Sequence, residues 1–294
     1  MQIRKAMIPW LFLAPAIVTI VLILLYPVFS GIRLSFFSYS MRDFAVGDAP
    51  SFIGLQNFRF LFSSGHFLSS VRVTLTFVSA VVLIEMALGL AIALLMEDEK
   101  LKGLRLFRTM FVLPIMIAPV VVGLIWRFMY NPSYGILNYF LERLGFESVM
   151  WLSNPSLALP SIIIADVWQW TPFVFLVLLA GLQSVPKDLT EAGIVDGCNY
   201  LQNLFYIRLP MITSVVLVAA ILRLIDAFRA LVVIFIMTYG GPGVSTEVLS
   251  LHLYKTAFTA QRLGRASAVA VILLGILLIL SSVLAIRTMR SERR

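Results

Sequence analysis

Residues 191–210 read EAGIVDGCNYLQNLFYIRLP, a polar and amphipathic stretch between two long apolar runs. The 294-residue chain around it is 60% hydrophobic and 13% charged. Soluble domains are roughly 45–50% apolar and 25% charged, so most of this protein is solvated by lipid. A protein that only crosses a membrane does not need such a polar stretch. We therefore interpret it as a helix that docks into another protein.

Outside this stretch, apolar runs dominate the chain. A helix that crosses the bilayer core needs about 20 mostly apolar residues. Six runs meet this requirement, and they cover residues 7–30, 71–96, 107–130, 157–182, 211–237 and 266–287. We predict an all-α integral membrane protein with six transmembrane helices. The first run is longer than the apolar part of a signal peptide, so we expect it to remain as the first span.

Lysine and arginine residues near the ends of the spans predict the orientation. They are dense in the N-terminus, the short loop 97–106 and the C-terminal tail, and sparse in the longer loops 31–70, 131–156 and 238–265. Both termini are therefore expected in the cytoplasm, together with residues 183–210. This distribution also explains the net charge of +8 without a nucleic-acid partner.

We divide the chain into a first helix with its external loop (1–70), a core of five helices (71–287) and a basic cytoplasmic tail (288–294). Within the core, the docking helix is expected at about 188–198. Asp188 and the acidic residue three positions later are spaced like an acidic capping box, which predicts a helix start near Asp188.

Small residues follow in this helix. Ala192, Gly193 and Gly197 leave one side with little side-chain bulk, so another surface can approach the backbone closely. Either Gly197 or Asn199 is expected to end the helix before a second one runs toward Pro210.

The sequence lacks the common catalytic and metal-binding motifs. No lysine directly follows a glycine, so a phosphate-binding G-x-x-x-x-G-K-[ST] loop is impossible. The two histidines, His66 and His252, are expected in external loops and far apart, without metal-ligand spacing. The single cysteine, Cys198, is interpreted as a small apolar filler. We expect no catalytic residue and no metal site, and any nucleotide must be bound by another chain.

Ionisable residues inside a span cost roughly 2.5–3.5 kcal/mol each and usually face a cavity or a partner. Arg223, Asp226 and Arg229 lie at i, i+3 and i+6 in the fifth run, along one stripe of the helix. Either they form a polar wall of a translocation path that binds solute hydroxyls, or they neutralise one another or pair with another subunit.

The second and fourth runs also carry polar residues. Trp168, Gln169 and Trp170, with Asp166 nearby, combine aromatic faces and hydrogen-bonding groups that suit sugar rings. Tryptophans near span ends are also ordinary interfacial anchors. Glu85 lies in the middle of the second run, where a structural partner is expected rather than a ligand.

The docking stretch carries a family resemblance. It follows the pattern EAAxxDGAxxxxxFxxIxLP at Glu191, Ala192, Asp196, Gly197, Ile207, Leu209 and Pro210, and Phe205 lies one position after the phenylalanine of the pattern. It departs from the pattern at Gly193 and Cys198, where alanine is usual. The chain resembles the permease subunit of a binding-protein-dependent ABC importer of the carbohydrate type, which includes maltose and glycerol-phosphate systems. Other matches, such as Trp168-x-Trp170-x-Pro172, resemble the first of the two permeases in such systems. Leu231-Val232 replaces a frequent Phe-Asp pair.

The resemblance implies a type I ABC importer permease fold with a cytoplasmic coupling helix. It implies a second permease, two cytoplasmic ATPases that hold ATP and Mg, and an external binding protein that delivers a sugar or related polyol. No cofactor would be bound by this chain, which would lie in a bacterial or archaeal cytoplasmic membrane. The residues expected to dock the ATPase are Glu191, Ala192, Gly193, Asp196, Gly197, Leu209 and Pro210.

In this family the glutamate that matches Glu191 lies in a cleft of the ATPase near a basic residue. The alternative functions are an ion-coupled secondary transporter and a membrane scaffold. Neither explains the docking stretch, and the sequence shows no inverted repeat or broken mid-membrane helix of the kind common in secondary transporters.

Overall fold

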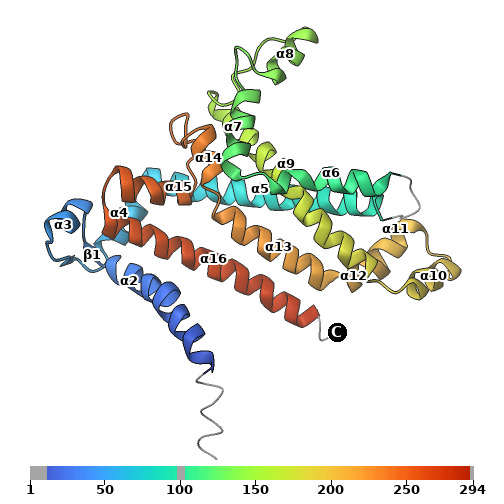
Figure 1. Cartoon of the computed structure of the whole chain (residues 1–294), viewed down its shortest axis with the longest axis horizontal. Helices are drawn as coiled ribbons and strands as arrows, with labels where there is room; N and C mark the ends of the chain where they lie inside the picture. The colour runs from blue at the N-terminus through green and yellow to red at the C-terminus, as the bar shows by residue number, and fades with distance from the viewer. Residues whose placement is uncertain (1–11, 98–102, 292–294) are drawn as a thin grey trace, which may run out of the picture. The chain divides into compact units, whose positions relative to one another are not determined.

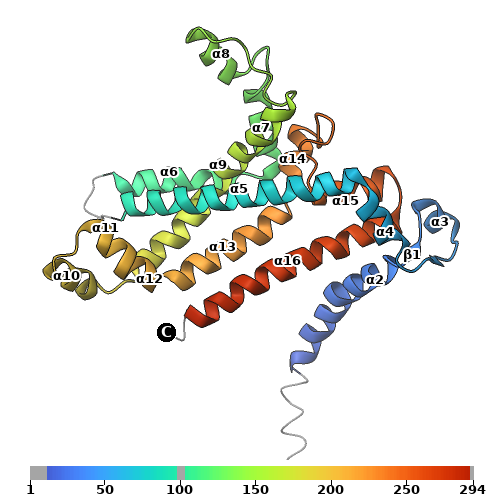
Figure 2. The ribbon, with the colours of Figure 1, turned by 180° about the vertical axis from the view of Figure 1, so that it is seen from behind.

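A computed structural model describes residues 12–97 and 103–291. Within them the chain is almost entirely helical (Figures 1 and 2). It forms two compact units, Met1–Phe67 with His252–Gly275 and Leu68–Leu251 with Ile276–Arg294. Several of the basic residues used to predict the orientation, among them Arg4, Lys5, Lys100 and Lys102, lie outside the described residues.

The first unit contains a short hairpin and several helices. Its elements are η1 (Ile20–Leu25), α2 (Tyr26–Leu34), β1 (Phe37–Ser38), α3 (Met41–Val46), β2 (Ser51–Phe52), α4 (Gln56–Ser63), η3 (Lys255–Thr259) and the start of α16 (Leu263–Ser291). Strands β1 and β2 are antiparallel, with Phe37 opposite Phe52. The Asn57 amide donates to the carbonyls of Ser35 and Phe37, which fixes α4 against β1.

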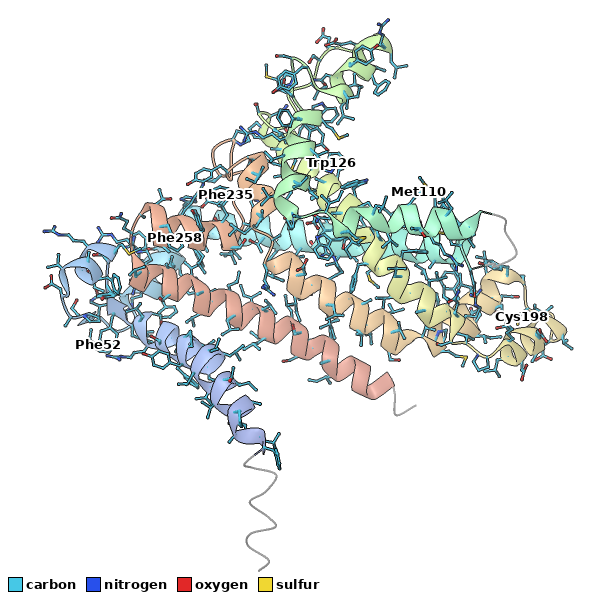
Figure 3. The ribbon with its side chains drawn as sticks, in the orientation of Figure 1. Phe52, Met110, Trp126, Cys198, Phe235 and Phe258 are labelled. Atoms are coloured by element: carbon cyan, nitrogen blue, oxygen red, sulfur yellow. The ribbon has the colours of Figure 1, made fainter. Side chains whose placement is uncertain are left out.

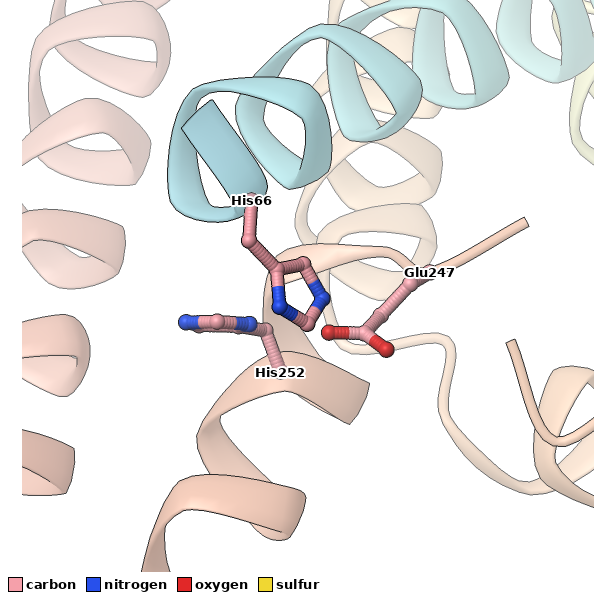
Figure 4. Close-up of side chains that lie close together, drawn as sticks. All are labelled: His66, Glu247 and His252. Atoms are coloured by element: carbon pink, nitrogen blue, oxygen red, sulfur yellow. The ribbon is translucent and has the colours of Figure 1, made fainter. Parts of the chain in front are cut away.

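Helix α16 approaches the same hairpin closely. The Gly264 N–H donates to the Tyr39 carbonyl at 2.9 Å. A Cβ at Gly264 would collide with the Phe37 carbonyl, so only glycine allows this approach. His66 and His252 also meet in this unit, edge to face, with ring centroids 4.9 Å apart (Figure 4). The expectation that the two histidines lie far apart is wrong, because contact in the fold does not follow sequence separation.

The second unit contains the remaining helices. They are α5 (Gly65–Leu95, which begins in the first unit), α6 (Leu104–Met116), α7 (Pro119–Met129), α8 (Ile136–Arg143), α9 (Pro155–Gln183), α10 (Lys187–Val195), α11 (Tyr200–Gln202), η2 (Asn203–Arg208), α12 (Leu209–Met211), α13 (Thr213–Phe228), α14 (Val232–Met237) and α15 (Leu249–Tyr254, which ends in the first unit).

Helices α5 and α9 pack together in the core of the second unit. Val174, Phe175 and Leu178 of α9 are buried in an apolar cluster with Ala93 of α5. The backbones approach closely at Gly89, where a Cβ would lie 2.7 Å from Val174 Cγ1 and 3.0 Å from the Phe175 nitrogen. Small residues allow such close packing between helices in a membrane.

Among the described residues, four helices are long and apolar enough to cross a membrane: Phe12–Leu34, Gly65–Leu95, Pro155–Gln183 and Leu263–Ile286. Two further spans are bent pairs, Leu106–Met116 with Pro119–Met129 at 98° and Tyr200–Met211 with Thr213–Phe228 at 70°. Six spans result when each bent pair is counted as one. The expectation that no span is broken is therefore wrong.

Proline explains the first break. Pro119 disfavours helical geometry at the residue before it, and Ala118 has an extended ψ of 137°. The predicted fifth span, 211–237, is also wrong as one helix, because α13 ends at Phe228 and α14 is separate. The break between α13 and α14 leaves the Ala230 carbonyl without a partner in a helix, and this carbonyl accepts a hydrogen bond from the Ser250 hydroxyl at 2.6 Å.

Candidate functional sites in the second unit

The docking stretch folds into a hairpin of helices, which we call the α10–η2 hairpin (residues 187–208; Figure 1). Helix α10 begins at Lys187 after Pro186, whose fixed φ suits a helix start. No side chain caps this start, so the predicted acidic capping box at Asp188 is wrong. Asp188 instead lies in the first turn, where its charge favours the positive end of the helix dipole.

The turn of the hairpin has distinct end and start signals. Helix α10 ends at Val195, and Gly197 follows with a left-handed φ of 87°. Asn199 then begins the return segment, since its side chain and that of Gln202 cap each other's backbone N–H groups. Gly197 therefore follows the first helix, and Asn199 begins the second one.

Gly193 is buried inside this hairpin. A Cβ on Gly193 would meet the end of the Ile207 side chain and lie 3.0 Å from the Asn203 amide nitrogen. That amide donates to the Thr190 carbonyl at 2.9 Å. The missing side chain thus lets α10 pack against η2 of the same chain, a contact that the sequence interpretation did not include. Ala192 and Gly197 remain exposed.

The outer surface of the hairpin is acidic and apolar. Glu191 and Asp196 are exposed. Val195 is 86% exposed and follows the exposed Ile194 in α10, and Tyr206 of η2 is 78% exposed. Cys198, labelled in Figure 3, is half-buried at the turn. Exposed apolar side chains mark interaction surfaces where they form a patch.

Two arginines fasten the hairpin and α6 to the end of α5. Arg208, at the end of η2, is buried and forms an ion pair with Glu97. The Arg108 guanidinium donates to the carbonyl of Met96. The pair of Arg208 and Glu97 could not be predicted from the sequence, because the partners are 111 positions apart and no short motif contains both.

A second site is a buried ionic cluster around Arg223 of α13. The guanidinium binds both carboxylate oxygens of Glu85, from α5, and one oxygen of Asp166, from α9, at 2.8 Å. It also binds Asp226 of its own helix at 2.8 Å. The Trp170 ring lies over the guanidinium, with its centroid 4.9 Å from the Arg223 Cζ. Arg223, which is 1% exposed, therefore joins three helices.

The cluster has more acidic groups than basic ones, since three carboxylates surround one guanidinium. Breaking such a buried pair by removing one partner costs about 3–5 kcal/mol, because the other charge is left without compensation. Asp226 differs from the other members, since its side chain is 44% exposed. It is the most exposed carboxylate of the cluster.

The predicted solute-path residues do not all lie together in the structure. Arg223, Asp226, Glu85 and Trp170 lie together in the cluster, whereas Arg229 is exposed at the end of α13. Two other predicted residues have different neighbours. The Trp168 ring meets Trp126 edge to face at 5.9 Å, and the Gln169 amide donates to the Ile117 carbonyl at the bend between α6 and α7.

The fold is that of a helical membrane protein with four candidate spans in the part of the chain that the structure describes, or six when each bent pair of helices is one span. The chain matches the family model described as "binding-protein-dependent transport system inner membrane component" over residues 86–291, and it belongs to this family. It is therefore a multi-pass inner-membrane permease subunit of an ABC transporter, and not the subunit that carries out catalysis.

Its relatives include sugar-transport permeases. The chain is 38% identical to a probable ABC transporter permease protein of Sinorhizobium fredii, over 98% of this chain and 92% of the relative. It is 37% identical to the trehalose/maltose transport system permease protein MalF of Thermococcus litoralis, over 90% and 86%. It is 32% identical to the sn-glycerol-3-phosphate transport system permease protein UgpA of Agrobacterium fabrum, over 94% and 92%.

A solved structure has the same fold. A chain of a bacterial alginate ABC transporter, crystallised with a periplasmic protein bound to an alginate pentasaccharide, superposes with a TM-score of 0.82. The match covers 96% of this chain and 94% of that chain at 24% identity. The predicted permease fold is thereby confirmed.

Proposed function

We propose that this chain is the first-type permease of an ATP-driven importer for a sugar or related polyol. The solute class is supported by the relatives, whose names include trehalose/maltose and sn-glycerol-3-phosphate transport systems. In the proposed assembly a second permease completes the pathway, an external binding protein delivers the solute, and two ATPases hold ATP and Mg. Both termini lie in the cytoplasm in this proposal.

The observation that carries the proposal is the α10–η2 hairpin. Its outer surface combines the exposed carboxylates of Glu191 and Asp196 with exposed apolar side chains. Its inner surface is fixed by the Gly193 contact and the buried Arg208. A preformed, partly apolar projection loses little entropy on docking, which favours tight association with a rigid partner. We assign this surface to the ATPase, with Glu191 placed near a basic residue in the ATPase cleft.

The solute path is proposed past the ionic cluster of the second unit. Asp226 and Trp170 are the candidates for hydrogen bonding and stacking with a sugar ring, and Trp168 and Arg229 are further candidates. Glu85 and Gln169 are buried in contacts within the chain, so we assign them supporting roles around the path.

Substituting Glu191 tests the docking. Glu191→Lys reverses a charge on the exposed face of α10, and we expect the ATPase to be lost when the complex is purified through a tag on this chain. Glu142→Lys is the matched control, since Glu142 is exposed on α8 and lies outside the hairpin. Unchanged recovery of the ATPase with Glu191→Lys contradicts the proposal.

A further inference from the structure

The first unit contains a polar cavity of about 340 Å³ between β1, α4 and the first turn of α16. These elements lie side by side in Figures 1 and 2. Side chains with hydrogen-bond donors predominate around the cavity. It is lined by Ser38, Tyr39, Ile53, Gln56, Asn57, Phe60, Arg262 and Arg265.

The two arginines of the cavity have no ion-pair partner among the residues that the structure describes. Arg265 stacks on the Phe60 ring, with its Cζ 3.5 Å from the centroid, and its buried Nε has no hydrogen-bond acceptor. Arg262 is exposed. The Asp43 carboxylate interacts electrostatically with Arg262, but it accepts a hydrogen bond from the Ser40 N–H in the cap of α3. The cavity therefore holds two positive charges that the chain itself does not pair.

The position of these arginines adds to the unbalanced charge. Arg262 immediately precedes α16 and Arg265 lies in its first turn, which contains no acidic residue. A helix N-terminus carries partial positive charge and is stabilised by anions, so two cations there repel the helix dipole. A bound anion would neutralise the two arginine charges and would also interact favourably with the N-terminus of α16.

The other lining groups suit an oxyanion. Among the described residues, no protein acceptor binds the side chains of Gln56 and Tyr39, which can donate into the cavity. Asn57 is already bound to two carbonyls and so shapes the cavity. Arginine presents N–H groups in a planar fork that matches the oxygens of a phosphate, and stacking on an aromatic ring leaves that fork available.

Three candidate spans end beside this cavity. Phe12–Leu34 ends shortly before Ser38, Gly65–Leu95 begins shortly after Phe60, and Leu263–Ile286 begins next to Arg262. Since a span ends where the hydrocarbon core meets the polar headgroups, we expect the cavity to lie near the depth of the lipid phosphates. Exposed phenylalanines in the same unit, including Phe52 (Figure 3), are typical of side chains at this depth.

We propose that this cavity binds a phosphate oxyanion through Arg262 and Arg265, supplied by a phospholipid headgroup or by free phosphate. Its depth favours the headgroup. The site is separate from the α10–η2 hairpin, and it does not depend on the identity of the transported solute.

The first test uses the purified transporter complex with the double substitution Arg262→Gln/Arg265→Gln. The matched control is Arg59→Gln, since Arg59 is exposed on α4 and does not line the cavity. After a detergent wash, phosphatidylglycerol retained by each complex is measured by mass spectrometry. The delipidated complexes are then melted in sodium phosphate and in sodium chloride at equal ionic strength.

Phospholipid retention that falls several-fold in the double variant alone supports the headgroup as the source. Protection by phosphate without lipid retention, lost in the double variant alone, supports free phosphate. The proposal is wrong if the double variant and the Arg59→Gln control agree in both measurements. It is also wrong if the double variant loses only the binding protein, because the arginines then contact an acidic protein surface.

A second test needs no substitution. Phenylglyoxal modifies accessible arginines, and the rate at each arginine of the unaltered complex is read by peptide mass spectrometry. Added phosphate or phosphatidylglycerol should slow the modification of Arg262 and Arg265 and leave that of Arg59 unchanged. Equal rates with and without these anions at all three positions overturn the proposal.

Discussion

At the scale of single residues, Arg223 has the largest consequences for stability. It neutralises Glu85 and Asp166, which are both buried, so Arg223→Met leaves two carboxylates without their cation. We expect a loss of about 3–5 kcal/mol and a strongly reduced melting temperature of the purified complex. Arg223→Lys should restore little, since an ammonium lacks the planar fork that binds several carboxylates.

Asp226 should behave differently from Arg223. Its side chain is half exposed, so Asp226→Asn keeps a hydrogen-bonding group and removes one of three acidic charges. We expect near-normal melting and a reduced rate of solute uptake in proteoliposomes. A melting temperature as low as that of Arg223→Met, or an unchanged uptake rate, contradicts the role of Asp226 as the solute-facing member of the cluster.

The cap of α3 gives a pH dependence outside the spans. Hydrogen bonding to the side chain and then the backbone of Ser40 lowers the pKa of Asp43 below its usual value. A depressed folded-state pKa means that the cap stabilises α3 above the unfolded-state pKa and is lost as the pH falls through the folded-state pKa. Amide exchange in residues 40–47, corrected for its intrinsic pH dependence, should therefore increase upon acidification. Asp43→Ala should remove this change with pH.

At the scale of elements, the close approach of α5 and α9 depends on Gly89. A valine at this position places atoms against Val174 and against the backbone of Phe175. Such overpacking costs about 1–3 kcal/mol. Gly275→Val is the matched control, since a Cβ at Gly275 meets nothing within 4 Å. The melting temperature should fall for Gly89→Val only, and equal melting of the two variants contradicts tight packing between α5 and α9.

The helix breaks show where the sequence informs an element and where it does not. Hydropathy predicted the apolar runs, because a span requires them whatever its direction. Hydropathy carries no information on the direction of the helix axis, so it did not predict the bend at Ala118 or the break after Phe228. Pro119 was a local signal for the first break. The break between α13 and α14 contains no proline or glycine. The Ala230 carbonyl at this break accepts its hydrogen bond from Ser250, which lies in a later segment.

At the scale of the whole molecule, the sequence predicted the permease family and a helix near residues 188–198, because residues 191–210 carry a local pattern. It did not predict the contacts that connect distant parts of each unit. Glu85 and Arg223 are 138 positions apart, and a lone ionisable residue in a span indicates a partner without naming it. The charges were visible in the sequence, but their pairing depends on the packing of α5, α9 and α13.

The pair of Arg208 and Glu97 is expected to transmit the movement of the α10–η2 hairpin into α5. Arg208→Met removes the ion pair and leaves the exposed surface of α10 unchanged. We therefore expect the ATPase to co-purify normally, while solute uptake per ATP hydrolysed falls in proteoliposomes. The reciprocal exchange Glu97→Arg/Arg208→Glu should recover part of the uptake, since it restores opposite charges at the same contact. If Arg208→Met takes up the normal amount of solute per ATP hydrolysed, the hairpin acts on the helices by another route. If Arg208→Met loses the ATPase, Arg208 contributes to docking, and docking and transmission cannot be separated by changing this ion pair.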